Sequence, residues 1–150
     1  MQISLKDKVA LVTGGSRGIG RAIALALADS GAAVVVNYKG NQAAADEVVR
    51  AIESRDGRAL AVQADVAQPA DVERLFKQVI DTYGRLDILV NNAGVTRDTL
   101  LLRMKETDFD EVINTNLRGT YLCTKAALRP MSRARGGRII NITSVVGLIG

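Results

Sequence analysis

The 150-residue sequence contains no histidine, no tryptophan and a single cysteine, Cys123. One cysteine excludes an internal disulfide and is typical of a reducing compartment. Without histidine or a second cysteine, we expect no metal site with nitrogen and sulfur ligands. The five aromatic residues, two Phe and three Tyr, are too few for a base-stacking platform, so we expect no nucleic-acid partner.

Long apolar runs are also missing. No run reaches the ~18 residues that a membrane helix needs, and residues 1–15 lack the pattern of a signal peptide. We therefore expect no membrane association and a cytoplasmic location. With 47% hydrophobic residues, residues 1–150 can form one domain with its own core.

Acidic residues are absent from the last quarter of the chain. Residues 1–111 carry 14 basic and 16 acidic residues, whereas residues 112–150 carry six basic and no acidic ones. This asymmetry indicates either an acidic partner near the basic segment or a balancing acidic segment elsewhere in a longer chain, and the sequence does not separate the two.

What is present is an alternation of short apolar runs with segments of helical periodicity. The runs are continuously apolar, as in strands buried on both faces, and cover 9–13, 33–37, 59–65, 87–92 and 138–143. Right-handed crossovers between them predict an α/β fold: a Rossmann-type, doubly wound parallel sheet of five strands in the order 3-2-1-4-5. Ligands of such sheets bind at the carboxyl ends of the strands.

The last long helical segment, residues 106–130, carries an apolar stripe that includes Phe109, Ile113 and Leu117. We expect this stripe to face the core. Asn116 falls on it, and a buried amide needs hydrogen-bond partners. Asn116 therefore has either a role in a site or a structural role in kinking the helix.

The string "TGGSRGIG" at 13–20 follows the first strand and opens the first helix. Glycines allow the backbone to approach a diphosphate closely, and the helix N-terminus offers free N–H groups. The alternative is a glycine-rich turn without a ligand. The candidate cofactor-binding residues of this turn are Gly14, Ser16, Arg17, Gly18, Ile19 and Gly20.

A P-loop is the rival interpretation of the same segment. The spacing from Gly15 nearly fits, but Arg21 stands at the lysine position and Ala22 at the magnesium-binding hydroxyl position. Without these two groups the γ-phosphate and its metal are not held. We therefore do not expect a nucleotide-hydrolysing enzyme.

The end of the second strand bears on the choice of cofactor. An Asp or Glu there binds the ribose 2′-hydroxyl of NAD, but this strand is expected to end in Asn37. The missing carboxylate and the nearby Arg17 favour NADP(H), because a guanidinium pairs well with a 2′-phosphate. The missing acid also disfavours an S-adenosylmethionine site.

Together these motifs resemble the short-chain dehydrogenase/reductase family. The matching strings are "TGGSRGIG", "DV" at 65–66, "NNAG" at 91–94, Asn116 in "INTNLRGTY" and Ser144 in "ITSVVG", and they span essentially the whole chain. Within the family, "KVALVTGGSRGIGRAIA" and "GRIINITSVVG" are most similar to 3-oxoacyl-[acyl-carrier-protein] reductases.

The resemblance implies roles for residues at the strand ends. Asp65 would bind the adenine amino group with Val66 beside it. Asn92, Ala93 and Gly94 would line the cofactor near its ribose. These assignments come from the family pattern rather than from the spacing of the residues themselves.

The resemblance also implies two catalytic residues. Asn116 would hold a water of a proton relay, and the Ser144 hydroxyl would bind the substrate carbonyl oxygen. The family's Tyr-x-x-x-Lys does not follow Ser144 within the 150 residues. "YLCTK" fits it formally with Tyr121 and Lys125, but it precedes Ser144, and we interpret it as a coincidence.

We therefore expect the N-terminal portion of an NADPH-dependent 3-oxoacyl-[acyl-carrier-protein] reductase, with a sheet incomplete on its C-terminal side and no activity of the 150 residues alone. Its partner would be a carrier-bound substrate, docked at Arg129, Arg133 and Arg135. Self-association through the last strand and the long helix is expected as well. The alternatives are a non-catalytic NADP-binding module and a self-assembling, purely structural half-domain.

Overall fold

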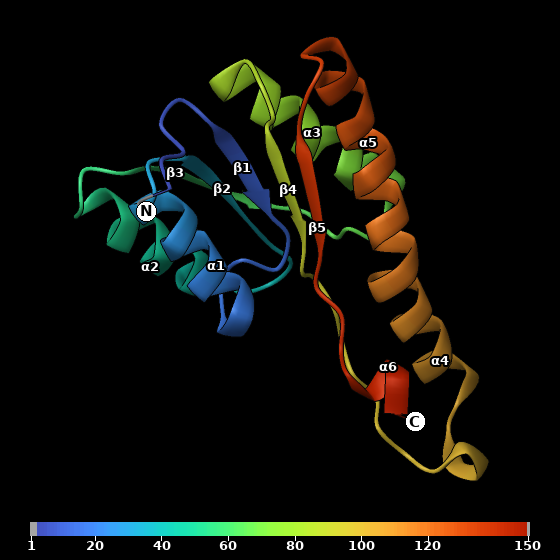
Figure 1. Cartoon of the computed structure of the whole chain (residues 1–150). Helices are drawn as coiled ribbons and strands as arrows, with labels where there is room; N and C mark the ends of the chain where they lie inside the picture. Colours follow the sequence, from blue (N-terminus) through green and yellow to red (C-terminus); the bar gives the residue numbers. More distant parts are fainter. Residues whose placement is uncertain (1–2, 150) are drawn as a thin grey trace.

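The computed structural model describes residues 3–149, in which five parallel strands form a single sheet covered by helices (Figure 1). The order β3-β2-β1-β4-β5 confirms the predicted doubly wound sheet. The strands are β1 Val9–Val12, β2 Ala33–Tyr38, β3 Arg58–Gln63, β4 Ile88–Asn91 and β5 Arg138–Asn141.

Helices cover both faces of the sheet (Figure 1). One face carries α1 and α2, and the other carries α3 and the long helix formed by α4, η2 and α5. The helices are α1 Gly18–Asp29, α2 Gln42–Glu53, α3 Pro69–Tyr83, the 3₁₀ turn η1 Leu101–Arg103, α4 Glu106–Val112, the π-helical segment η2 Ile113–Arg118, α5 Gly119–Arg133 and α6 Val146–Ile149.

The two faces explain why the strand sequences are continuously apolar. In β1, Leu11 packs into the core under α3 and α5, while the next residue, Val12, packs under α1 and α2. Both side chains are fully buried. Since alternate residues point to opposite faces, a strand covered twice needs apolar side chains at every position.

The long helix corrects one expectation. The predicted inward stripe is wrong, because Phe109, Ile113 and Leu117 are 55%, 38% and 64% exposed. The residues that face the core recur every fourth position and include Gly119, whose missing side chain lets the helix approach Val66. The inward residues are Thr115, Gly119, Cys123, Ala127 and Met131.

The physical reason lies in the size and number of the side chains. The helix has two apolar stripes, and the one with the smaller residues allows the closer approach to the sheet. The larger residues are left at the surface. The helix also continues past the predicted end, since Pro130 lies within α5. Among residues 3–149, no helix combines the length and apolar character needed to cross a membrane.

Candidate nucleotide-binding site

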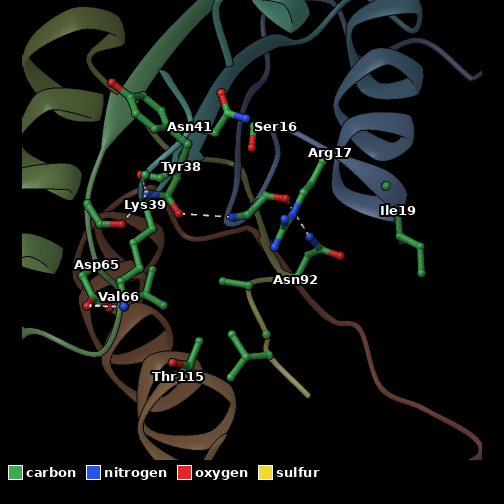
Figure 2. A pocket seen from close by; sticks show the side chains of 18 residues that line it. Ser16, Arg17, Ile19, Tyr38, Lys39, Asn41, Asp65, Val66, Asn92 and Thr115 are labelled. Carbon is green, nitrogen blue, oxygen red and sulfur yellow. Dashed lines mark hydrogen bonds and ion pairs between the residues drawn. The ribbon is translucent and has the colours of Figure 1, made fainter. Parts of the chain in front are cut away.

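A cavity of about 710 Å³ lies at the carboxyl ends of the strands, between the glycine-rich turn, the end of β2, the turn after β3 and the loop after β4 (Figure 2). Eleven of the candidate cofactor-binding residues line it. They are Gly14, Ser16, Arg17, Gly18, Ile19, Asn37, Asp65, Val66, Asn92, Ala93 and Gly94. Gly20, Asn116 and Ser144 do not line the cavity.

The glycine-rich turn opens the first turn of α1 toward the cavity. Arg17 is the N-cap residue, but its side chain makes no capping hydrogen bond, and the first turn carries no acidic residue. Gly18 has φ +53° and its missing side chain faces open space, a conformation that favours glycine. Among residues 3–149, the first N–H groups of α1 are therefore without a side-chain acceptor, as in anion-binding helix termini.

Gly20 does not line the cavity itself but packs against Gly14 and Asn92, which do. A Cβ atom at this position would lie 2.2 Å from the Gly14 carbonyl oxygen and 2.4 Å from the Asn92 side-chain nitrogen. The same nitrogen donates hydrogen bonds to the carbonyls of Thr13 at 3.1 Å and Gly14 at 3.0 Å. Gly20 thus lets α1 pack against a turn that Asn92 holds in place.

Thr13 is a residue that sequence reasoning missed. Its hydroxyl accepts hydrogen bonds from the backbone N–H groups of Asn92 and Ala93, both at 3.0 Å, and donates to the Val90 carbonyl at 3.3 Å. It is 2% exposed. The available signal was a hydroxyl residue placed directly after an apolar strand, where a buried polar group must find partners.

Asn37 has a different position from the one expected. β2 runs one residue further, to Tyr38, and the Asn37 side chain is 2% exposed although the residue lines the cavity. Its oxygen accepts from the Gly14 N–H at 3.2 Å, and its nitrogen donates to the carbonyls of Val62 at 3.3 Å and Ala64 at 3.1 Å. Asn37 joins β2, β3 and the glycine-rich turn.

The charged group at this end of the cavity is Lys39, which the sequence reasoning also missed. Its ammonium pairs with Asp65 Oδ2 at 2.9 Å, and the side chain reaches across the cavity edge (Figure 2). Asp65 Oδ1 accepts from the Ala67 N–H at 3.0 Å, which fixes the carboxylate. The available signal was a lysine two residues after Asn37, at the carboxyl end of the second strand.

The turn that carries Asp65 is supported from α3. The backbone N–H of Asp65 donates to Asp71 Oδ2 at 2.8 Å, and Arg74 donates to Asp71 Oδ1 at 2.9 Å. The hydrogen bond from Asp65, followed by that from Arg74, holds the pKa of the Asp71 carboxyl below its ordinary value. Arg74 also donates to the Gln63 carbonyl at 2.9 Å and so ties α3 to the end of β3.

The two candidate catalytic residues lie outside the cavity lining. Asn116, in η2, accepts from the Val95 N–H at 2.8 Å and donates to the Val95 carbonyl at 2.9 Å. It thereby fixes the loop after β4. Ser144 lies beyond β5 and is exposed, and its hydroxyl accepts from the Val146 N–H at 3.3 Å.

Tyr121 and Lys125 form a local surface contact. The Lys125 ammonium lies 5.8 Å from the centre of the Tyr121 ring, and both side chains are exposed. Neither lines the cavity. This cation–π contact gives the formal Tyr-x-x-x-Lys spacing an ordinary structural explanation.

Comparison with known proteins places this arrangement in a family. The family model described as short chain dehydrogenase matches residues 8–150. A 3-oxoacyl-[acyl-carrier-protein] reductase from Synechocystis sp. is 56% identical over 147 residues, which are 98% of this chain and 60% of that protein. The reductase FabG from Staphylococcus aureus is 52% identical over 143 residues, 95% of this chain and 58% of that protein.

Solved structures agree. A short-chain dehydrogenase from Burkholderia cenocepacia, in complex with NADP, has a TM-score of 0.88 and 42% identity, over 96% of this chain and 58% of that one. A short-chain dehydrogenase/reductase mutant from Serratia marcescens has a TM-score of 0.88 and 40% identity, over 93% of this chain and 56% of that one. The chain belongs to the short-chain dehydrogenase family and spans about 60% of the length of its curated relatives.

Proposed function

We propose that the cavity binds NADP(H), with the cofactor diphosphate at the N-terminus of α1. The observation that carries this proposal is the uncapped first turn of α1, which opens into the cavity beside Arg17. Bare backbone amides at a helix N-terminus, together with a guanidinium, form a donor set suited to phosphate oxygens. A dinucleotide also needs a large cavity, and about 710 Å³ is available.

The adenosine end would lie between Lys39 and Asp65. The ammonium of Lys39 suits the 2′-phosphate, while Asp65 suits the adenine amino group. Asn92, Ala93 and Gly94 would border the ribose next to the nicotinamide. The cavity edge at β2 offers the cation Lys39 rather than the carboxylate typical of NAD sites, which supports NADP(H) over NAD(H).

The reaction we propose for the lineage is reduction of a 3-oxoacyl group bound to acyl carrier protein, as named for the relatives at 56% and 52% identity. Bound NADPH would supply the hydride. In this proposal Ser144 donates a hydrogen bond to the substrate carbonyl, and Asn116 holds a water in a proton relay. Both residues act beside the cavity rather than within its lining.

For the 150 residues by themselves, we propose binding without turnover. The formal Tyr-x-x-x-Lys match at Tyr121 and Lys125 is engaged in an exposed surface contact and does not line the cavity. Tyr121 is therefore not placed to act as a general acid at the cavity. A nucleotide-binding module is the second candidate function, and a purely structural half-domain is the third.

Titration of NADPH fluorescence tests the binding proposal, and the absorbance of the reduced nicotinamide with a 3-oxoacyl substrate tests turnover. Arg17→Ala should weaken NADPH binding by about tenfold, because a charge-assisted phosphate contact is lost. Arg21→Ala is the matched control, one turn further along α1 and outside the cavity lining. Absence of NADPH binding by the folded protein would contradict the proposal.

The acidic partner that we propose for this chain is the acyl carrier protein. Arg129 and Arg133 line a groove of about 930 Å³ between α3 and α5, with Arg135 just beyond. This end of α5 lies at the opposite end of the sheet from the cavity (Figure 1). Arg135→Glu should impair a carrier-bound substrate more than a free ketone in an active full-length relative, and equal effects would reject the docking role.

We also propose self-association. β5 is an edge strand, and the outward stripe of the long helix exposes Phe109, Leu117, Tyr121 and Leu128 by 52–64%. An unpaired edge beside exposed apolar side chains favours association. Size-exclusion chromatography with light scattering should show a dimer or larger assembly, and a stable monomer would refute this.

A further inference from the structure

Five residues beside the cavity form a closed ring of contacts. Lys39 pairs with Asp65 at 2.9 Å, and the Lys39 carbonyl accepts from the Gln63 side chain at 3.0 Å. Arg74 links the Gln63 carbonyl to Asp71, and Asp71 accepts from the Asp65 N–H. The ring joins the ends of β2 and β3 to the start of α3.

Within this ring, backbone and side chains have different freedom. The backbone of Lys39 is held by Gln63, and that of Asp65 by Asp71. The Asp65 side chain is 20% exposed and is fixed by the Ala67 N–H, whereas the Lys39 side chain is 65% exposed. The ammonium is therefore the part of the ring that can move, because its only ion-pair partner among residues 3–149 is Asp65.

We propose that the Lys39–Asp65 pair is a latch that sets how strongly the site prefers nucleotides with a ribose 2′-phosphate. The phosphate draws the Lys39 ammonium away from Asp65. Asp65 therefore lowers the affinity for the phosphate by competing for Lys39, without touching the phosphate itself. This inference rests on the proposed binding of NADP(H) in the cavity.

The charges determine the direction of the effect. A phosphate monoester carries close to two negative charges at neutral pH, so it competes for the ammonium against one carboxylate. When the ammonium moves, the carboxylate stays behind, held by Ala67, and repels the phosphate. Removing the charge of Asp65 should consequently favour the phosphate twice, by releasing Lys39 and by ending the repulsion.

The test compares two probes, adenosine 2′,5′-bisphosphate and adenosine 5′-monophosphate, by isothermal titration calorimetry. The variants are Lys39→Met, Asp65→Asn and the double variant. Lys77→Met is the matched control, because Lys77 also pairs with an aspartate, Asp81, but lies outside the cavity. Lys39→Gln is a second variant that keeps side-chain polarity, and circular dichroism verifies that each variant is folded.

The measured quantity is the ratio of the two affinities. Lys39→Met and Lys39→Gln should reduce the preference for the bisphosphate by about tenfold, the size of a charge-assisted contact. Asp65→Asn should raise that preference by about threefold, in line with an exposed ion pair. In the Lys39→Met background the further change Asp65→Asn should raise the ratio less, because only the repulsion remains to be relieved.

Two results obtained with the variants would overturn the latch. One is an unchanged ratio in both Lys39 variants, which would assign the phosphate to Arg17 alone. The other is an Asp65→Asn variant whose ratio is unchanged or lower. If the folded wild-type protein binds neither probe, the proposed function itself fails, and the latch fails with it. Binding of both probes with equal affinity rejects the latch and the 2′-phosphate preference but leaves nucleotide binding intact.

Discussion

The rim built by β1 to β4 and the segment from β5 onward present opposite kinds of surface. At the rim, Thr13 and Asn37 are 2% exposed, and every polar side-chain atom of both has a hydrogen-bond partner. From Ile140 to Ile149, by contrast, every residue is exposed. The site that would hold a nucleotide is thus organised by contacts within these residues, whereas the neighbourhood of Ser144 is not.

The cause is the number of neighbours. Within residues 3–149, β1 has a hydrogen-bonded strand on each side, whereas β5 pairs only with β4. One side-chain hydrogen bond, from the Asn91 nitrogen to the Asn141 oxygen at 2.9 Å, joins the two at their ends. The comparison teaches that the residues proposed to bind the nucleotide are held by contacts on several strands, whereas the segment around Ser144 follows a strand paired with β4.

The largest predicted effect comes from adding a methyl group at Gly20, where α1 packs tightly against the glycine-rich turn. Gly20→Ala places a methyl group 2.2 Å from the Gly14 carbonyl oxygen, so the turn or α1 must shift. We expect a loss of about 3 kcal/mol in the free energy of unfolding, together with loss of nucleotide binding. Urea denaturation and NADPH titration measure the two effects.

The control for this change lies in the exposed segment. Gly147→Ala meets no atom within 4 Å and lies in α6, so it should alter the unfolding free energy by less than about 1 kcal/mol. Equal effects of the two substitutions would contradict the contrast between the regions.

A second prediction concerns Thr13, whose hydroxyl forms hydrogen bonds with three backbone groups. Thr13→Val removes the acceptor of two backbone N–H groups, and leaving such groups without partners costs about 2 kcal/mol. Thr13→Ser keeps the hydroxyl and should retain most of the stability. Thr143→Val, in the exposed segment, should change the unfolding free energy by less than about 0.5 kcal/mol. A similar loss of unfolding free energy at both threonines would show that the Thr13 hydrogen bonds do not account for the effect.

A third, smaller effect depends on pH. The pKa of Asp71 lies below its usual 3.8, so its contribution to stability is present above that pH and is lost as the pH falls through the lowered pKa. Asp71→Asn should destabilise the fold at neutral pH by about 1 kcal/mol or less. Denaturation curves at decreasing pH should show the difference from wild type shrinking, and a difference that stays constant down to strong acid would assign the loss to shape rather than charge.

The sequence was sufficient for the sheet and for most of the cavity lining. Strands buried on both faces leave a continuous apolar pattern, and the glycine spacing marks the turn into α1. Both signals lie within short stretches of the sequence, so they can be recognised without the tertiary structure. The same reasoning could not give Thr13 or Lys39 their places, because their partners Ala93 and Asp65 lie far along the chain.

The error on the long helix has a different origin. Its segment has one stripe of large apolar residues and one of small residues, and periodicity alone favours the large ones. Packing against the sheet favours the small ones, since Gly119 lies where a Cβ would be 2.7 Å from Val66. For Asn37, the expected strand end was one residue short, because the polar Asn37 interrupts the apolar run although β2 continues to Tyr38.

The smallest predicted effect is at the residue with the most specific catalytic expectation. The Ser144 side chain is exposed, and its one hydrogen bond in the described part of the chain is the 3.3 Å contact from the Val146 N–H. Ser144→Ala should therefore change the unfolding free energy by less than about 0.5 kcal/mol and nucleotide affinity by less than about twofold. In an active full-length relative the equivalent change should lower kcat strongly, because a hydrogen bond to the developing charge is lost. A marked loss of nucleotide affinity in Ser144→Ala would instead show that the segment around Ser144 contributes to nucleotide binding.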